Sequence, residues 1–273
     1  MSEQKATPGR ERITTTHAGW GAGHPRLHVR SDHDRYVHEI TTDLTRVGSA
    51  DDNEIVLPGA DALHATITHD ATDEYVLTMF GTGETNAGHR DGPEGQRHLT
   101  ETLRTGAHFT AGGWRLVFAR DEFADHGRPY GGRQGGEFAH QRRQGPRPDY
   151  TPMGGLSDEQ VILIEQVVHG AENPAFEFYV VKDEKVAIYN AMVGETEIGG
   201  LSYNMAGEDR LVLLELSVFP MHRKQGIATE LIRRVLDDVR AHRRTVIVLC
   251  PIVHSFIGRH PEYADLVVPD EAA

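Results

Sequence analysis

Residues 211–239 read LVLLELSVFPMHRKQGIATELIRRVLDDV, and this stretch decides the fold of the C-terminal half of the chain. It opens with a strongly apolar segment at 211–218, which is typical of a strand buried on both faces of a sheet. A helix is predicted from Lys224 to His242, because its apolar residues make one stripe at helical spacing. A second buried strand at 246–250 follows directly, so the order strand, helix, strand predicts a mixed α/β sheet.

The rest of the C-terminal half fits the same interpretation. Ser157-Asp-Glu-Gln160 has the pattern of a capping box and predicts a helix that runs through Val168. Three further strands are expected at 176–181, 185–193 and 196–204, and a short helix at 252–258. We therefore expect one domain over 156–273 with the element order αβββ–β–α–β–α.

The N-terminal half has a different pattern. Short alternating or β-branched segments separated by turn residues run from Arg26 to Phe118, and none has a long helical period. This spacing predicts an all-β sandwich over 25–120. The polar residues 1–24 are interpreted as a disordered tail, and the Gly-, Pro- and Arg-rich residues 121–155 as a flexible linker.

Composition excludes several classes of protein. The net charge of −13 argues against binding to a nucleic-acid backbone, and no apolar run is long enough for a membrane helix. The N-terminus lacks the apolar stretch of a secretory signal. Cys250 is the single cysteine, which excludes an internal disulfide framework and a cysteine-rich zinc site. We therefore expect no membrane, nucleic-acid or metal partner, and a cytoplasmic location.

The segment Arg223-Lys-Gln-Gly-Ile-Ala228 is a candidate anion-binding site. The first N–H groups of a helix have no internal partner, and the helix dipole adds partial positive charge there. Gly226 and Ala228 allow close approach to the backbone, and Arg223 and Lys224 add full charge. An ordinary helix start is the alternative for such a short string, but the flanking buried strands favour a site for a diphosphate.

The stretch Leu214 to Val267 resembles the GNAT superfamily of N-acetyltransferases, which bind acetyl-CoA on an R/Q-x-x-G-x-G/A loop. More narrowly, it is similar to small YjdJ-type acetyltransferase-like proteins. The matching residues are Gly226-Ile-Ala228, Val248-Leu-Cys-Pro251 and His260-Pro-Glu-Tyr-Ala-Asp-Leu-Val267. The resemblance implies a mixed-sheet acyl-CoA N-acyltransferase fold and an acetyl-CoA cosubstrate.

By this resemblance, Val218 offers backbone groups to the pantetheine arm where the central strands splay. The diphosphate is held by Arg223, Lys224, Gln225, Gly226, Ile227 and Ala228. Acetyl transfer also needs a deprotonated amine and a proton for the leaving thiolate. Glu215 is a candidate general base, with an ordinary strand carboxylate as the alternative. Cys250 lies beside the thioester by resemblance, with a small buried residue as the alternative.

One departure from the family affects the proton chemistry. Relatives carry tyrosine on the helix after Cys-Pro, where this chain has Phe256, which cannot donate a proton. Tyr263, Cys250 or water then has to serve as the acid, or activity is weak. Tyr263 also has a plain packing role as its alternative.

Residues 46–118 resemble a forkhead-associated (FHA) domain. Arg46 to Leu57, Asp61 to Ile67 and Leu103 to Phe118 follow the entry, central and closing motifs of that family. Such domains bind phosphothreonine through residues whose equivalents here are Ser49, Asp61 and Ala62, together with an Asn motif that is blurred into 84–87. Two cationic contacts are therefore missing, and a carboxylate stands where phosphate would approach. We expect a degenerate module without ordinary phosphothreonine affinity, and either a protein partner or the chain's own linker remains open as its ligand.

Two functions follow from these observations. The first is an acetyl-CoA-dependent N-acetyltransferase that acts on an amine of unidentified kind and is targeted by its FHA-like module. The second is a non-catalytic acetyl-CoA or CoA sensor, or a protein-interaction scaffold. Cys250 and Glu215 favour the enzyme, whereas Phe256 and the degenerate N-terminal loops favour the binding protein.

Overall fold

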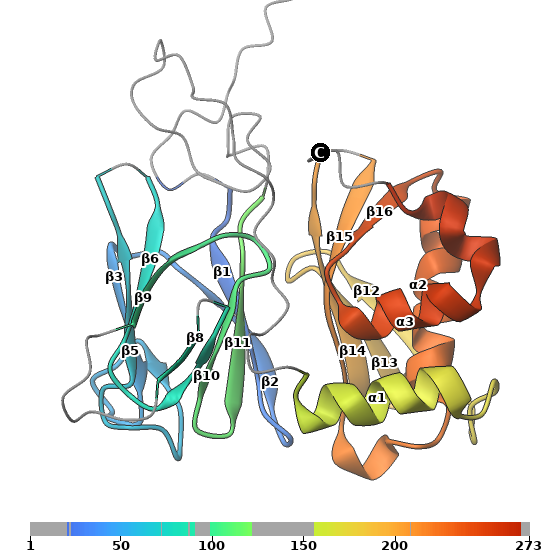
Figure 1. Ribbon diagram of the computed structural model, residues 1–273, viewed down its shortest axis with the longest axis horizontal. Helices are drawn as coiled ribbons and strands as arrows, with labels where there is room; N and C mark the ends of the chain where they lie inside the picture. The colour runs from blue at the N-terminus through green and yellow to red at the C-terminus, as the bar shows by residue number, and fades with distance from the viewer. Residues whose placement is uncertain are drawn as a thin grey trace, which may run out of the picture.

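The computed structural model describes residue 21 and residues 23–71, 73–86, 88–90, 99–121, 156–207 and 209–268. These residues form a β sandwich and a mixed α/β domain that lie side by side (Figure 1). The predicted fold class is therefore confirmed for both halves. Most of the predicted tail at 1–24 and all of the predicted linker after residue 121 lie outside the described residues, so those boundaries stay predictions.

The β sandwich consists of two sheets. The first has the order β2 (Arg35–Glu39), β1 (Arg26–Arg30), β11 (Trp114–Ala119), β10 (His108–Ala111), β7 (Gly83–Thr85) and β8 (Gly88–Arg90). The second has the order β4 (Ile55–Val56), β3 (Leu44–Gly48), β5 (Ala65–His69), β6 (Tyr75–Met79) and β9 (Leu99–Leu103). Alternate residues such as Leu27, Val29, Leu77 and Phe109 fill the core between them.

The C-terminal domain has one five-stranded sheet. Its order is β12 (Tyr179–Asp183), β13 (Ile188–Val193), β14 (Thr196–Met205), β15 (Arg210–Val218) and β16 (Thr245–Val248). The first four strands are antiparallel, and β15 and β16 are parallel. The helices are α1 (Asp158–His169), α2 (Ile227–Ala241) and α3 (Pro251–Arg259), with 3-10 turns η2 (Pro220–His222) and η3 (Pro261–Leu266).

Local sequence signals account for the ends of two helices. The predicted capping box is present, because the Ser157 side chain accepts from the Gln160 N–H and the Gln160 side chain accepts from the Ser157 N–H. Helix α2 begins at Ile227 rather than at the predicted Lys224. The reason is that Lys224 and Gly226 have φ values of 61° and 75°, which a right-handed helix cannot include. Of the helices within the described ranges, none has the length and apolarity to span a lipid bilayer.

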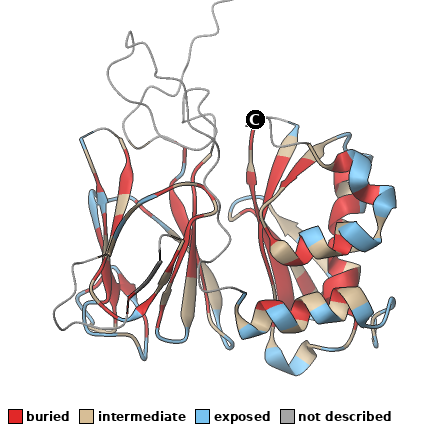
Figure 2. Cartoon of the chain, in the orientation of Figure 1, coloured by how far each residue is buried: buried red, intermediate tan, exposed pale blue. Residues whose placement is uncertain are grey.

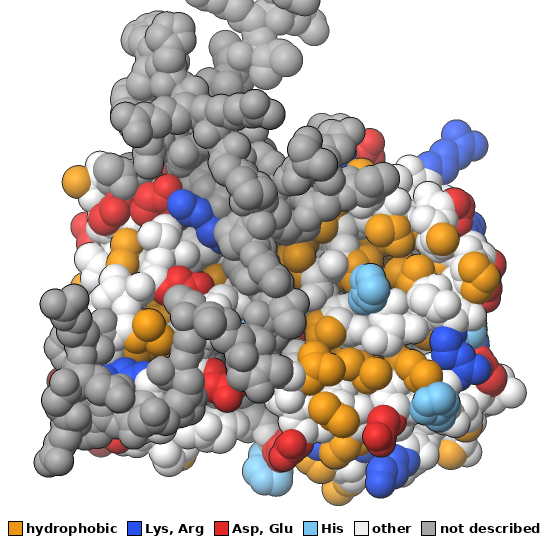
Figure 3. All heavy atoms as spheres, in the orientation of Figure 1, with side chains coloured by type: hydrophobic (Ala, Val, Ile, Leu, Met, Phe, Trp, Pro, Cys, Tyr) orange, Lys and Arg blue, Asp and Glu red, His pale blue; other side chains and the backbone are white. Residues whose placement is uncertain are grey.

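The two faces of the C-terminal sheet are covered by different structures. The helices pack on one face, where Leu163, Leu213, Leu231 and Phe256 share a single buried cluster. The other face lies against β1, β2 and β11 of the sandwich (Figures 1 and 2). A smaller apolar cluster, with Val117 of β11 and Val212, Leu214 and Ile247 among its members, closes this junction. Hydrophobic side chains also gather on the surface of the C-terminal domain that is in view in Figure 3.

A β-bulge in β15 changes which side chains face the sandwich. Ser202 pairs with Glu215 and Tyr203 with Leu213, so Leu214 is an extra residue on β15. Leu214 joins the apolar junction, and its neighbour Glu215 contacts sandwich arginines on the same side. Because of the bulge, two consecutive residues of β15, Leu214 and Glu215, both face the sandwich.

The junction between the domains also contains buried charge. From the sandwich, Arg26 donates to Asn204, and the Arg35 guanidinium donates to Asn190 and to the Gly199 carbonyl. Gly200 makes room for that guanidinium, because a Cβ there would lie 2.2 Å from an Arg35 nitrogen. These contacts hold the sandwich against one face of the C-terminal sheet.

Candidate functional site

The loop between β15 and α2 has an uncapped helix N-terminus at its end. Gly226 is the N-cap residue of α2, and no side chain caps this helix. The backbone N–H groups at the start of α2 have no partner within the helix, and the helix dipole adds positive potential. With Lys224 and Gly226 both at positive φ, the loop is the kind of backbone that binds anions.

Glycine is required at position 226 for a second reason. A Cβ on Gly226 would lie 2.5 Å from the backbone oxygen of Asn173. The segment after α1 therefore packs directly against the loop. The Ala175 N–H of this segment also donates to the Gln225 carbonyl at 2.9 Å. This close packing fixes the conformation of the loop independently of any ligand.

Strands β15 and β16 separate next to this loop. Strand β16 pairs with β15 only from Arg210 to Leu213. The N–H groups of Leu249 and Cys250 then both donate to the Leu213 carbonyl, and the chain turns into α3. Within the described residues, β15 therefore continues to Val218 with no strand pairing on that side, which is the splay expected from the sequence resemblance.

Val218 and Arg223 are brought together at the end of β15. Arg223 Nε donates to the Val218 carbonyl at 2.9 Å. The Arg223 guanidinium also contacts the carboxylates of Asp32 and Glu159, each at 3.0 Å. Arg223 thus braces the loop and is neutralised by two acids, whereas Lys224 is exposed beside the helix start. The part of each residue in holding a diphosphate stays a prediction.

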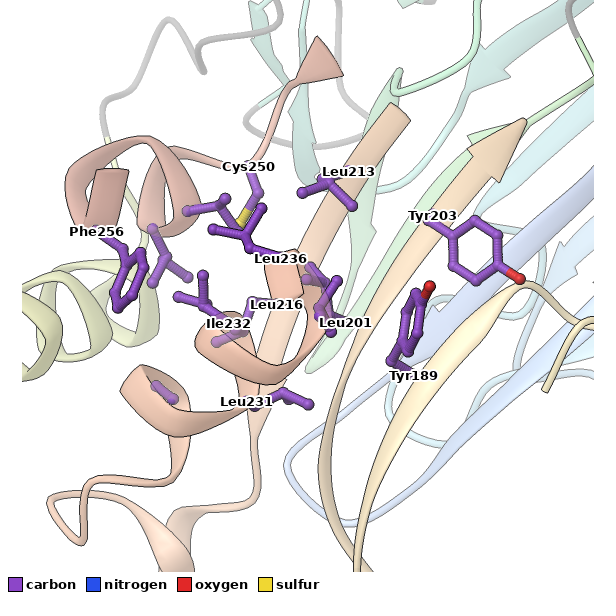
Figure 4. Close-up of a cluster of buried hydrophobic side chains, with 14 of the residues drawn as sticks. Tyr189, Leu201, Tyr203, Leu213, Leu216, Leu231, Ile232, Leu236, Cys250 and Phe256 are labelled. Atoms are coloured by element: carbon purple, nitrogen blue, oxygen red, sulfur yellow. The ribbon is translucent and has the colours of Figure 1, made fainter. Parts of the chain in front are cut away.

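Cys250 is completely buried at the base of the splay (Figure 4). It is the N-cap residue of α3 and packs in the cluster with Leu213, Leu216 and Phe256. Burial raises the pKa of the thiol, although the N–H groups of Val253, Leu216 and Ile252 favour the thiolate. The sulfur is placed between the splayed strand and the helix but is held in its neutral form.

We expect Cys250 in the native protein to react with a disulfide reagent such as DTNB at least about a hundredfold more slowly than in the unfolded chain, because both thiolate formation and access require local opening. The measurement is the rate of thiol labelling at pH 8 with and without denaturant. Equal rates in the two conditions would show that the thiol is open to solvent in the native protein.

Glu215 is placed on the opposite face of the sheet from the helices. Its carboxylate is buried and accepts from Arg30 at 2.8 Å and from Arg115. Burial alone would raise the pKa of Glu215, but the charges of Arg30 and Arg115 outweigh it and hold the pKa well below its usual range. The structure thus brings Glu215 to the sandwich junction, while its role as a general base stays a prediction.

Tyr263 lies in η3 and is tied to α2. Its hydroxyl donates to Asp237 at 2.9 Å, and its ring packs near Phe256 with centroids 5.9 Å apart. Burial, then the Asp237 interaction, raises the pKa of Tyr263 to about 12. Phe256 is fully buried and stacks on His260. The role of Tyr263 as a general acid stays a prediction.

The sandwich loops are held by the residues that the sequence retains from the FHA pattern. Asn53 donates to the carbonyls of Ala50 and Ala62, both at 2.8 Å, and the buried His64 contacts Asp61. The Ser49 N–H donates to the Asp61 carbonyl. The three positions that depart from the FHA pattern therefore lie together, with the Asp61 carboxylate 58% exposed among them.

Several charged residues of the junction were not identified from the sequence. Arg30 and Arg115 contact Glu215, while Asp32 and Glu159 contact Arg223. Arg30 and Arg115 lie on strands that alternate as if one face met solvent, while Asp32 lies in the turn after β1 and Glu159 in the first turn of α1. No local signal therefore separates these four from surface residues. Among the described residues, no cluster of three or more His, Cys, Asp or Glu side chains is arranged to hold a metal ion.

Comparison with solved structures gives FHA domains and related proteins as neighbours of the N-terminal region. The Slr1951 protein from Synechocystis sp. is 16% identical, with 36% of this chain and 95% of that chain covered and a TM-score of 0.27. The FHA domain of CT664 from Chlamydia trachomatis is 16% identical, with 35% and 96% covered and a TM-score of 0.28. EmbR from Mycobacterium tuberculosis, in complex with a low affinity phosphopeptide, is 20% identical, with 35% and 24% covered and a TM-score of 0.28.

The comparison with curated proteins finds no match. The comparison with protein families matches the segment that contains the splayed strands, the loop before α2 and Cys250. Residues 186–266 of this chain match the family described as GCN5-related N-acetyl-transferase.

Proposed function

We propose that the C-terminal domain is an acetyl-CoA-dependent N-acetyltransferase that transfers the acetyl group to an amine. The observation that supports this most is the uncapped start of α2 at Gly226, placed directly beside the splay between β15 and β16. A diphosphate fits the free N–H groups and positive end of the helix, and an extended pantetheine arm fits the unpaired edge of β15. The family match over 186–266 supports the same reaction class.

The loop residues have separate tasks in this proposal. The backbone of Gly226, Ile227 and Ala228 and the exposed Lys224 hold the diphosphate, while Gln225 and Arg223 hold the loop in shape. Val218 lies at the edge along which the pantetheine arm runs. In the reaction, the amine nitrogen forms a bond to the thioester carbon and the carbon–sulfur bond breaks. One proton leaves the amine and one reaches the departing thiolate.

Cys250 is the residue best placed to supply that proton. It lies at the base of the splay, and burial keeps its thiol neutral, which suits a proton donor better than a nucleophile. Glu215 has a strongly lowered pKa and is held by two arginines, so we assign it to the domain junction rather than to proton transfer. The Tyr263 hydroxyl donates its proton to a hydrogen bond with Asp237, so we do not assign it to proton transfer.

Titration calorimetry with acetyl-CoA tests the proposal. We expect micromolar binding to the unmodified protein and at least about a tenfold higher Kd for Lys224→Glu, since the added carboxylate faces the diphosphate. Lys185→Glu is the matched control, because Lys185 is also exposed but lies in the turn between β12 and β13. An unmodified protein that does not bind acetyl-CoA would rule the proposal out.

A non-catalytic acetyl-CoA-binding protein is the second candidate. Phe256 favours it, because this side chain has no proton to donate where the sequence resemblance places a tyrosine. Release of CoA in the presence of amine acceptors separates the two candidates. Binding without release from any acceptor class would support the sensor.

A further inference from the structure

A chain of ion pairs runs from the candidate acetyl-CoA loop into the β sandwich. In order, its members are Asp32, Arg223, Glu159, Arg30, Glu215 and Arg115. The sign of charge alternates at every step, so each inner member has an opposite charge on both sides. No pair along the chain is separated by more than 3.0 Å.

Every step of this chain crosses between the two domains except Arg223–Glu159, which lies within the C-terminal domain. Asp32, Arg30 and Arg115 belong to the sandwich. Glu159 is in the first turn of α1, and Glu215 is on β15. Apart from Asp32, whose side chain is 57% exposed, these side chains are only 7–15% exposed. A buried charge that loses its partner is costly, so the members depend on one another.

Arg30 is the member that joins the two halves of this chain. One terminal nitrogen contacts Glu159 and the other contacts Glu215. Burial would lower the pKa of Arg30, but Glu215 and Glu159 more than reverse this and hold the guanidinium charged. The planar fork of arginine suits this bridging role, which a lysine ammonium cannot reproduce.

Glu159 links Arg30 to Arg223, the arginine at the loop. Its Oε2 contacts Arg30 and its Oε1 contacts Arg223, so the two arginines share one carboxylate. Arg223 in turn donates to the carbonyl of Val218, where β15 ends and the loop begins. A change in the position or charge of Glu159 therefore affects the loop through its contact with Arg223.

We propose that Arg30 of the β sandwich is a positioning residue for the acetyl-CoA loop, so that the sandwich completes the acetyl-CoA site of the neighbouring domain. This inference rests on the proposed function. Without Arg30, Glu159 would keep a full negative charge with only Arg223 to balance it. Arg223 would then be drawn toward Glu159, and the potential at the diphosphate would become more negative. Both changes weaken the binding of acetyl-CoA.

The test compares two buried arginines of the same junction. Arg30→Gln is expected to raise the Kd for acetyl-CoA about tenfold, as measured by titration calorimetry. Arg26→Gln is the matched control, because Arg26 is equally buried but contacts Asn204 and Asp121, away from the ion-pair chain. It is expected to lower the melting temperature and leave the Kd within about twofold.

A double variant separates positioning from general loss of structure. In Arg30→Gln/Glu159→Gln, the uncompensated carboxylate is gone, so the Kd is expected to return most of the way toward the starting value. A structural defect alone would not be repaired by a second substitution in the junction. If Arg30→Gln does not fold, Arg30→Lys decides, because a single ammonium cannot contact Glu159 and Glu215 with two separate nitrogens and leaves Glu159 less compensated. A raised Kd in Arg30→Lys then supports the inference, and an unchanged Kd overturns it.

Failure of the positioning role and failure of the proposed function give different results in these experiments. If the unmodified protein binds acetyl-CoA and Arg30→Gln binds it equally well, only the positioning role is overturned. An equal rise in Kd for Arg30→Gln and Arg26→Gln also overturns it, because the effect would belong to the junction as a whole. Absence of binding by the unmodified protein overturns the proposed function and this inference together.

Discussion

Glu215→Ala is expected to lower the free energy of unfolding by about 3–5 kcal/mol, which is the usual result of removing one partner from a buried ion pair. The reason is that Arg30 and Arg115 both converge on this carboxylate inside the junction. Their side chains are only 10% and 13% exposed, so water cannot replace the lost partner. Urea denaturation, followed by a signal from each domain, measures the change.

The matched control is another glutamate of the same junction. Glu197→Ala removes a partner of Arg35, but Glu197 is 31% exposed and Arg35 keeps its hydrogen bonds to Asn190 and Gly199. Its expected cost is about 1–2 kcal/mol, less than that of Glu215→Ala, because only one arginine loses a charged partner and that arginine keeps two hydrogen bonds. Equal costs for the two variants would contradict the view that Glu215 anchors the domains. A Glu215→Gln variant that folds normally but loses turnover would instead restore Glu215 as a general base.

Acidification from pH 7 to pH 5 is expected to lower the free energy of unfolding by about 4 kcal/mol, about 2 kcal/mol for each of two buried histidines. Burial, helped by the charges of Arg26 and Arg35, lowers the pKa of His28 to about 3, against an opposing effect of Glu215. Burial, helped by the charges of Arg115 and Arg30, likewise lowers the pKa of His108 to about 3, again against Glu215.

The sign follows from the protons that each state binds. Between about pH 6.5 and pH 3 the unfolded chain binds a proton on each histidine, and the folded protein does not, so stability falls as the pH falls. Above pH 6.5 both states are neutral and the contribution disappears. His38 and His64, whose pKa values burial also lowers, act in the same direction.

His28→Phe tests this explanation. Neither ring nitrogen of His28 has a hydrogen-bond partner among the described residues, so an apolar ring of similar shape is expected to cost little at pH 8. The variant is expected to remove about half of the stability loss between pH 7 and pH 5, measured by urea denaturation at each pH. The exposed His254 provides the control, His254→Phe, which should leave the pH profile unchanged. A His28→Phe profile identical to that of the unmodified protein would contradict the explanation.

These predictions share one structural cause, which is that the sandwich covers a whole face of the C-terminal sheet. The described helices all pack on the other face. Charged and histidine side chains such as Arg30, His108 and Glu215 are therefore enclosed where the two domains meet. Each domain is therefore expected to be much less stable when the other domain is absent.

The sequence by itself determined the elements that depend on local patterns. The capping box at Ser157–Gln160, the apolar strand ending at Val218 and the loop before α2 are set by neighbouring residues and were found where predicted. The start of α2 was predicted three residues too early, because helical spacing does not reveal that Lys224 and Gly226 adopt positive φ.

Only the tertiary structure decided what covers each face. Arg26-Leu-His-Val-Arg30 alternates as a strand with one side in solvent would, yet all five residues are buried. Arg30 and Glu215 are separated by 185 positions, and their contact also needs the bulge at Leu214. The physical reason is that periodicity reports the local conformation and the polarity of each face. Which charges meet across a junction depends instead on how two separately folded sheets pack together.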